Sequence, residues 1–299
     1  MFFECNTSKD IETEFLFNSK TYLQQSGKNV YTAQASIGSE YLLCQLTEIE
    51  DAVYVSGYRA TFGGIEGSAI IVLDNFIKTI LNELRHRNAK SLLIRQAPSL
   101  YDSSFAEACQ DVLLEHGFRL QSSDINQHIV VDGIFEDKID IQERKKLRRL
   151  REAGLTCKLY DRVEGDEWFD LLSRAREHKN FPLTLSKEAY YNLSKELPEI
   201  YTYAGVFLNE RLVANAVFVK ISENAIYYFV PASDPEYNYL SPAVLILESM
   251  YQLAMDQHCS IVDLGISSVD GILNQGLYKF KKNMGAIDSQ KNIYKYTFD

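Results

Sequence analysis

The feature that most constrains this chain is an order of strands and helices that occurs twice. In each half, the periodicity predicts a strand hairpin, a loop, a long helix, a strand, a second helix, a glycine and a further strand. Separations of 173, 169 and 168 residues relate three pairs of equivalent positions: Ser68 with Ser241, Leu92 with Ile261, and Gly117 with Gly285. A separation this constant favours a tandem duplication over the ordinary alternation of an α/β chain.

The predicted elements fall into two groups. The first half has expected helices at 68–87 and 105–116 and strands at 41–46, 52–58, 91–95, 118–120 and 128–131. The second has expected helices at 242–258 and 273–283 and strands at 201–207, 212–220, 225–230, 261–264 and 291–298. Between them lies a basic segment that Asp140 can cap and Gly154 can end as a helix. We therefore predict an α/β fold with two tandem domains, residues 1–135 and 136–299.

Charge and cysteine usage narrow the class of protein. A formal net charge of −10 disfavours DNA as a partner. The 5 cysteines are widely spaced without a C-x-x-C pair, which fits a cytoplasmic protein and opposes a disulfide framework or a zinc site. The N-terminal residues lack the pattern of a secretory signal, and no apolar run is long enough to predict a transmembrane segment.

Common catalytic motifs are missing from the sequence. It contains no G-x-S-x-G, G-x-x-x-x-G-K-[ST], H-E-x-x-H or G-x-G-x-x-G segment. The 5 histidines show no metal-ligand spacing, so no metal is expected. What remains is anion binding at helix starts and a distinctive C-terminal region.

That C-terminal region carries a family resemblance. A tyrosine-rich strand, YYFVPAS, precedes a long helix, a strand VDLG, and the helix GLYKFKKNMG, which has the form G-x-x-x-F-K-x-x-x-G. These segments resemble the FemABX-type double-GNAT acyltransferases. RKKLRRLREAGL is similar to the start of the family's second domain, and FGGIEG lies where the first domain has a glycine motif. The resemblance implies two GNAT-like domains, each with a mixed, mainly antiparallel sheet flanked by helices, and an active site in the second.

The resemblance also implies an activity. It suggests an N-acyltransferase that moves an acyl or aminoacyl group from an activated donor to an amine. Acetyl-CoA or another acyl-CoA is the expected cofactor, and a small molecule or a peptidoglycan or polysaccharide precursor the expected acceptor. The loop DPEYNYLSP lacks the glycines that usually hold coenzyme A pyrophosphate. Two alternatives therefore stay open: a catalytically silent GNAT-fold binding module, and a tRNA-dependent peptidyltransferase, although the acidic chain disfavours tRNA.

Three residues are candidate catalytic groups. Lys281 matches the lysine of the family's F-K pair and would stabilise the oxyanion of a tetrahedral intermediate. Tyr278 would donate a proton to the leaving group, and Asp263 would accept one from the amine. Because successive helical residues are rotated by about 100°, Lys279 and Lys282 are expected to face solvent while Lys281 faces the site.

The candidate binding residues each have a structural alternative. Phe229, Val230 and Ala232 are expected to bind the donor, although they could equally belong to the core of the sheet. Ser241 is also expected to bind the donor, although serine at this position also indicates a helix N-cap. Acceptor binding is expected from five residues: Gly63, Gly64, Arg144, Arg148 and Arg151. Both glycines suit either an anion at a helix start or a tight turn. The arginines belong to a basic helix that is either a solvated face, a pyrophosphate site or a tRNA contact.

Overall fold

The structure is a computed structural model that describes residues 2–7, 12–183 and 185–299. The chain forms two compact units. Unit 1 comprises Met1–Asn126, Ile266–Asn274 and Asp288–Asp299, and unit 2 comprises Gln127–Gly265 and Gln275–Ile287. The units thus differ from the expected division at 135/136, because two later segments join unit 1. The chain first passes from unit 1 to unit 2 within one strand, β7 (Arg119–Val130).

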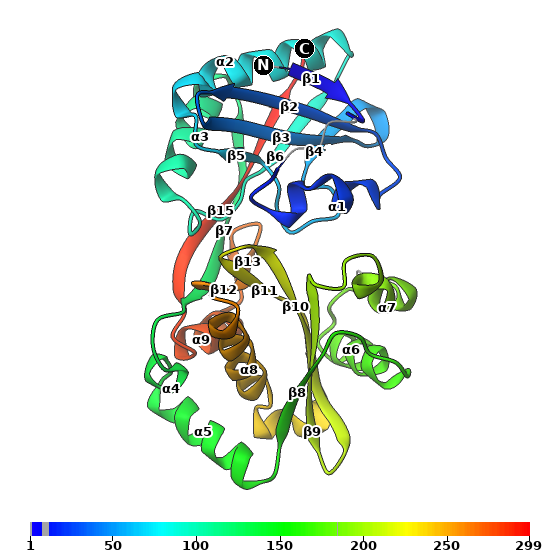
Figure 1. The fold of residues 1–299 in the computed structure, drawn as a ribbon, viewed down its shortest axis with the longest axis vertical. Helices are drawn as coiled ribbons and strands as arrows, with labels where there is room; N and C mark the ends of the chain where they lie inside the picture. The colour runs from blue at the N-terminus through cyan, green and yellow to red at the C-terminus, as the bar shows by residue number, and fades with distance from the viewer. Residues whose placement is uncertain (1, 8–11, 184) are drawn as a thin grey trace. The chain divides into compact units, whose positions relative to one another are not determined.

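Unit 1 is built on a mixed sheet with the strand order β1-β2-β3-β4-β6-β15, in which β5 pairs with β3 (Figure 1). Its strands are β1 (Phe2–Cys5), β2 (Val30–Ile37), β3 (Glu40–Glu48), β4 (Val53–Ser56), β5 (Ile65–Gly67), β6 (Ser91–Arg95) and β15 (Ile287–Thr297). Its helices are η1 (Leu16–Asn18), α1 (Lys20–Gln24), η2 (Glu50–Ala52), η3 (Ile70–Val72), α2 (Leu73–His86) and α3 (Ser103–Glu115). Within this order β4 and β6 run parallel and the other neighbours antiparallel.

Unit 2 contains a sheet with the order β12-β11-β10-β9-β8. Its strands are β8 (Thr156–Tyr160), β9 (Tyr201–Leu208), β10 (Arg211–Ser222), β11 (Ala225–Ser233) and β12 (Ile261–Ile266). Its helices are α4 (Phe135–Lys138), α5 (Ile141–Glu152), α6 (Glu167–His178), α7 (Lys187–Glu196), η4 (Pro235–Leu240), α8 (Ala243–Asp256) and α9 (Gln275–Asn283). Helices α8 and α6 cover opposite faces of this sheet, and α5 packs on α8 (Figure 1).

The order of elements confirms the predicted repeat. Strands β3 and β4, α2, β6, α3 and β7 in the first half correspond to β10 and β11, α8, β12, α9 and β15 in the second. Each half has one parallel pair, β4 with β6 and β11 with β12, in sheets that are otherwise mainly antiparallel. The expected fold class is therefore confirmed. A short hairpin of β13 (Ser268–Val269) and β14 (Ile272–Leu273) precedes α9.

Several local predictions need correction. The two short strands expected at 118–120 and 128–131 are one strand, β7, because the polar residues between them also take up extended pairing. Helix α2 begins at Leu73 rather than at Ser68, after the short helix η3, and lacks a side-chain cap. Helix α8 also lacks a side-chain cap, because Ser241 has left-handed backbone angles at the end of η4 (φ 61°) and Pro242 is the N-cap.

The helix between the halves forms as predicted. Asp140 caps α5 by accepting a hydrogen bond from the backbone N–H of Gln142 at 2.7 Å. Gly154 follows the helix with φ +81°, a conformation that disfavours residues with a Cβ atom. Leu147 and Leu150 of α5 are buried, so one stripe of this otherwise charged helix attaches it to unit 2.

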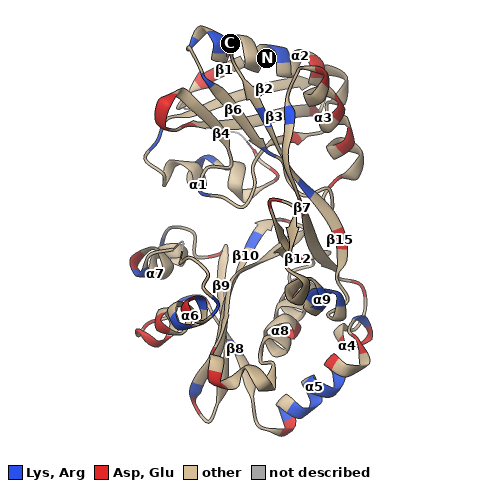
Figure 2. Ribbon diagram, turned by 180° about the vertical axis from the view of Figure 1, so that it is seen from behind, with Lys and Arg blue, Asp and Glu red and all other residues tan. Residues whose placement is uncertain are grey.

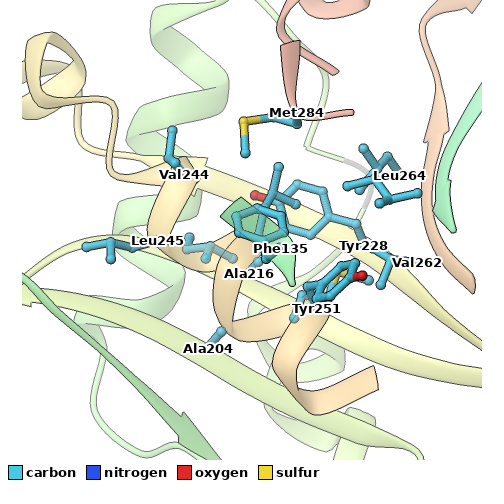
Figure 3. Close-up of a cluster of buried hydrophobic side chains, with 14 of the residues drawn as sticks. Phe135, Ala204, Ala216, Tyr228, Val244, Leu245, Tyr251, Val262, Leu264 and Met284 are labelled. Carbon is cyan, nitrogen blue, oxygen red and sulfur yellow. The ribbon is translucent and has the colours of Figure 1, made fainter. Parts of the chain in front are cut away.

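The core of unit 2 lies between its sheet and helix α8 (Figure 3). Phe135 of α4 and Tyr251 of α8 pack with ring centroids 5.3 Å apart. The Tyr251 hydroxyl donates a hydrogen bond to Gly133 O at 3.2 Å and accepts one from Asp132 N at 3.1 Å. Met284, directly after α9, belongs to the same cluster, so the core fixes the end of α9. In the described part of the chain, no helix is long and apolar enough to cross a membrane.

Candidate active site

The candidate site lies in unit 2, where the parallel pairing of β11 with β12 ends. Tyr227 of β11 is the register partner of Asp263 of β12. The Asp263 side chain is fully buried and its Oδ1 accepts a hydrogen bond from the backbone N–H of Gly265 at 2.8 Å. This turn, in which an aspartate bonds to the backbone two residues later, holds Gly265 at φ +71°. The carbonyl of Gly265 thereby gains a fixed direction.

Lys281 of α9 donates a hydrogen bond from Nζ to that carbonyl oxygen, Gly265 O, at 2.8 Å. Its side chain is 4% exposed, whereas Lys279 and Lys282 are exposed. The prediction that Lys281 alone of the three points inward is therefore confirmed. Tyr278, one helical turn earlier, is half-buried and shares the Lys281 side of α9.

Burial sets the proton affinity of this lysine. Desolvation lowers the pKa of Lys281 to about 7, against the opposing attraction of the Asp263 carboxylate. Near neutral pH, therefore, the amino group is present in both protonated and neutral forms. The protonated form can donate a hydrogen bond to a developing oxyanion, and the neutral form can accept a proton.

Tyr227 closes one side of this arrangement. A Cβ atom at position 265 would lie 2.8 Å from the Tyr227 hydroxyl oxygen, so glycine is required for the tyrosine to approach so closely. The ring of Phe229 lies 6.5 Å from that of Tyr227, between centroids. The hydroxyl of Tyr227 and the amino group of Lys281 thus both lie around Gly265.

Two cations at the C-terminal end of α6, Arg176 and the C-cap residue Lys179, were missed by sequence reasoning. Burial lowers the pKa of Arg176, and the nearby Tyr227 opposes this shift. Burial also lowers the pKa of Lys179, with a further contribution from Arg176. Within the described residues, neither cation has a carboxylate partner. Their i, i+3 spacing is the one signal in the sequence that could have drawn attention to them.

The strand expected to bind the donor contains a bulge. Phe229 pairs with Val217 and Ala232 with Asn215, so two residues of β11 face one of β10. Val230, inside the bulge, has φ 41°, which is unusual for a β-branched residue. Val230 and Ala232 are buried, and Phe229 and Ser241 are half-buried. Bulges commonly redirect side chains next to active sites, so this geometry is compatible with either expected role.

In unit 1, backbone packing accounts for both glycines of the predicted anion motif. A Cβ atom on Gly63 would lie 2.4 Å from Gly57 N, and the Gly63 N–H donates to Arg95 O at 2.9 Å. Gly64 has φ +81°, and a Cβ atom there would lie 2.8 Å from Gln96 Cα. Both residues are buried. The tight-turn interpretation explains this geometry without a ligand.

Glu66, three residues after Gly63, is a second buried ionisable group that the sequence did not reveal. Its carboxylate accepts hydrogen bonds from Glu14 N at 3.0 Å and Asn18 Nδ2 at 2.7 Å. Desolvation raises the pKa of Glu66 to about 7 although these hydrogen bonds oppose the shift. Glu66 therefore anchors the segment around η1 to strand β5.

The three predicted acceptor-binding arginines have different environments on α5. Arg144 and Arg148 are exposed, and Arg148 lies 3.6 Å from a Glu152 carboxylate oxygen. Arg151 instead binds the carboxylates of Glu136 and Glu248, at 2.8 Å for Glu136. The three arginines are therefore not equivalent members of one ligand site. No cluster of three or more His, Cys, Asp or Glu side chains suited to a metal ion occurs among the described residues.

Comparisons with known proteins identify a family match and similar folds. The FemAB family model matches residues 186–290, a range that includes Tyr227, Asp263 and Lys281. The fold is similar to the crystal structure of FemX, with a TM-score of 0.71, 13% identity and coverage of 95% of this chain and 92% of that chain.

Two further structures share the fold. One is L-PGS from Bacillus licheniformis, with a TM-score of 0.59, 14% identity and coverage of 89% of this chain and 83% of that chain. The other is a conserved protein from Bacteroides thetaiotaomicron, with a TM-score of 0.58, 13% identity and coverage of 97% and 99%. A comparison with curated proteins finds no match. The resemblance expected from the C-terminal motifs is confirmed by the FemAB match and the FemX fold.

Proposed function

We propose that this protein transfers an acyl or aminoacyl group from an activated donor to an amine, at the site around Gly265 in unit 2. The observation that carries the proposal is the buried Lys281 amino group, which lies 2.8 Å from Gly265 O and near Asp263. The FemAB match covers the same residues and supports the same reaction class.

The chemistry divides among the residues of the site. The amine nitrogen forms a bond to the donor carbonyl carbon, and the ester or thioester bond to the leaving group breaks. Protonated Lys281 donates to the oxyanion of the tetrahedral intermediate. Asp263 keeps Lys281 partly protonated and fixes Gly265, while the proton released by the amine passes to the leaving group through Tyr278.

The donor has two candidate classes. An acyl-CoA fits the GNAT-like order of elements, but the loop before α8 forms η4 and contains no glycine to cradle a pyrophosphate. An aminoacyl ester, carried by tRNA, fits the FemAB match. The acceptor is an amine on a small molecule or on a peptidoglycan or polysaccharide precursor. Arg176, which lies near Tyr227 and has no carboxylate partner among the described residues, suits an acceptor with a nearby negative charge.

A transfer assay tests the proposal directly. Acetyl-CoA, longer acyl-CoAs and aminoacyl-tRNA are first screened by thermal shift, because a ligand that binds the native state raises its melting temperature. Donors that bind are then supplied with muropeptide and amino-sugar amines, and the amide product is detected by mass spectrometry. Binding of a donor class without any amide product would favour the catalytically silent binding module.

Lysine variants identify the chemical role. We expect Lys281→Met to lower kcat by on the order of 100-fold with little change in donor KM, because an oxyanion partner acts in the transition state. Lys279→Met and Lys282→Met, on the same helix but exposed, are matched controls and should retain the parent kcat. Parent activity in Lys281→Met would remove this lysine from the mechanism.

A further inference from the structure

The outward face of helix α5 is a strip of positive charge. Viewed along the helix at about 100° per residue, Arg144, Lys145, Arg148 and Arg149 fall within roughly 140° of its circumference. All four are exposed, and the buried Leu147 and Leu150 hold the opposite side against unit 2. Figure 2 shows this concentration of blue along α5.

Most of this charge is not neutralised by the protein. Arg144, Lys145 and Arg149 have no carboxylate partner among the residues that the structure describes. Among these residues, the carboxylate partner of Arg148 is Glu152, at 3.6 Å. Both side chains are largely exposed, and such a pair contributes little to stability. The strip therefore keeps a net positive charge on a chain whose formal net charge is −10.

Apolar side chains accompany the strip. Ile141 lies at the centre of the same arc, in the first turn of α5, and is 55% exposed. Ile134, at the N-cap of α4 immediately before α5, is 67% exposed. Large exposed aliphatic side chains beside lysines and arginines are typical of helices that lie in the interface of a bilayer.

We propose that α5 docks this protein on a membrane surface that carries anionic lipid, with Arg144, Lys145, Arg148 and Arg149 at the headgroups and Ile141 at the acyl boundary. Clusters of four or more basic residues on a helix with an apolar component bind anionic bilayers through charge and a shallow apolar insertion. The acidic remainder of the chain is repelled by the same surface. Docking is thus confined to this helix.

The surface fits a bilayer better than it fits RNA. Proteins that hold single-stranded RNA add aromatic side chains on which bases stack, and the exposed face of α5 contains none. Exposed isoleucines gain nothing against a phosphate backbone, whereas a lipid interface removes them from water.

Vesicle sedimentation tests the proposal with the full chain. The parent is expected to sediment with phosphatidylcholine vesicles containing 30% phosphatidylglycerol, not with pure phosphatidylcholine, and to be released as salt shortens the Debye length to about 3 Å at 1 M. Changing Arg144, Lys145, Arg148 and Arg149 to Gln should lower the partition coefficient by about 1,000-fold, since each basic residue contributes about 1 kcal/mol at such a surface.

Two controls separate docking from general electrostatics. Changing Lys28, Arg119, Lys195 and Lys295 to Gln removes the same charge from exposed positions outside α5, and should leave sedimentation near the parent level. Ile141→Ser keeps every charge and should weaken binding by about tenfold, from lost apolar burial. Circular dichroism verifies that each variant is folded.

Three results would overturn the proposal. One is equal sedimentation with neutral and anionic vesicles, and another is an equal loss of binding in the two fourfold variants. The third is parent-like binding by Ile141→Ser together with tighter, α5-dependent binding to tRNA than to vesicles, which would assign the strip to RNA.

Discussion

A single buried lysine links the chemistry and the stability of unit 2. The G-x-x-x-F-K pattern and helical geometry were enough to predict that Lys281 faces inward while Lys279 and Lys282 do not. The sequence could not predict the partner of its amino group, Gly265 O, because that contact depends on the turn between Asp263 and Gly265 in β12. Arg176 was missed for a similar reason, since its neighbour Tyr227 is 51 residues away in the sequence.

The depressed pKa of Lys281 predicts a pH dependence of stability. Between about pH 7 and the ordinary lysine value of 10.5, the unfolded chain binds a proton at this residue that the folded chain lacks. The contribution of Lys281 to the free energy of unfolding therefore rises with pH across this window. Below about pH 7 the folded protein carries the buried amino group in its charged form, and the full cost of burying that charge lowers its stability. Chemical denaturation of the parent and Lys281→Met from pH 6.5 to 8.5 should show a smaller slope in the variant. Identical slopes would contradict the shifted pKa.

At the scale of elements, periodicity predicted the order of strands and helices better than their ends. Ser91–Arg95 is a strand as expected, and α3 lies within two residues of its predicted bounds. Strand β2 was missed because it alternates small and polar residues, which give a weak strand signal. The start of α2 was misplaced because Gly67 and Ser68 resemble a helix start, whereas hydrogen bonds from Ser68 N and Ala69 N to Tyr41 O keep this segment on the sheet.

A comparison of two glycines with the same φ angle tests whether close packing is enough to explain the glycine at position 64. Gly64 and Gly154 both have φ +81°, but a Cβ atom at Gly64 would lie 2.8 Å from Gln96 Cα, whereas nothing lies within 4 Å at Gly154. We expect Gly154→Ala to cost about 1 kcal/mol from left-handed strain, and Gly64→Ala to cost substantially more. Urea denaturation without any ligand measures both. Similar losses would show that the close approach at Gly64 is not limiting.

At the scale of the whole molecule, segments of the two units alternate along the sequence, so that no single boundary separates the units. Sequence patterns predicted the last strand but gave no indication of its neighbour, since pairing partners are not encoded in local periodicity. Strand β15 pairs antiparallel with β6, and its Tyr294 is buried in the core of unit 1. The Tyr294 hydroxyl donates to Gln110 Oε1 at 2.9 Å. Residues 1–135 thus lack part of their own core.

A truncated and a reconnected chain test this interleaving. Residues 1–135 alone should fail to show a cooperative thermal transition, because the edge of β6 and the Tyr294 site are left open. Ser289 Oγ lies 3.4 Å from Asn126 O, so a short Gly/Ser linker can join Asn126 to Asp288. The reconnected chain, residues 1–126 followed by 288–299, should regain the transition, and Tyr294→Ala should abolish it again. A stable 1–135 fragment would show that β15 is dispensable.

The position of β15 has a consequence for biosynthesis. Domains generally fold in order as they leave the ribosome, the N-terminal one first. Here the part of β15 that completes the N-terminal sheet, residues 288–297, is made after the last residue of unit 2, Ile287. At about 5–20 residues per second, the nascent first sheet waits many seconds with one edge unpaired. An unpaired strand edge of that kind is a target for chaperones and for aggregation. Growth at higher temperature should therefore reduce the yield of soluble protein. The aggregation should begin at the N-terminal sheet of unit 1, which is synthesised first, rather than at the C-terminal residues.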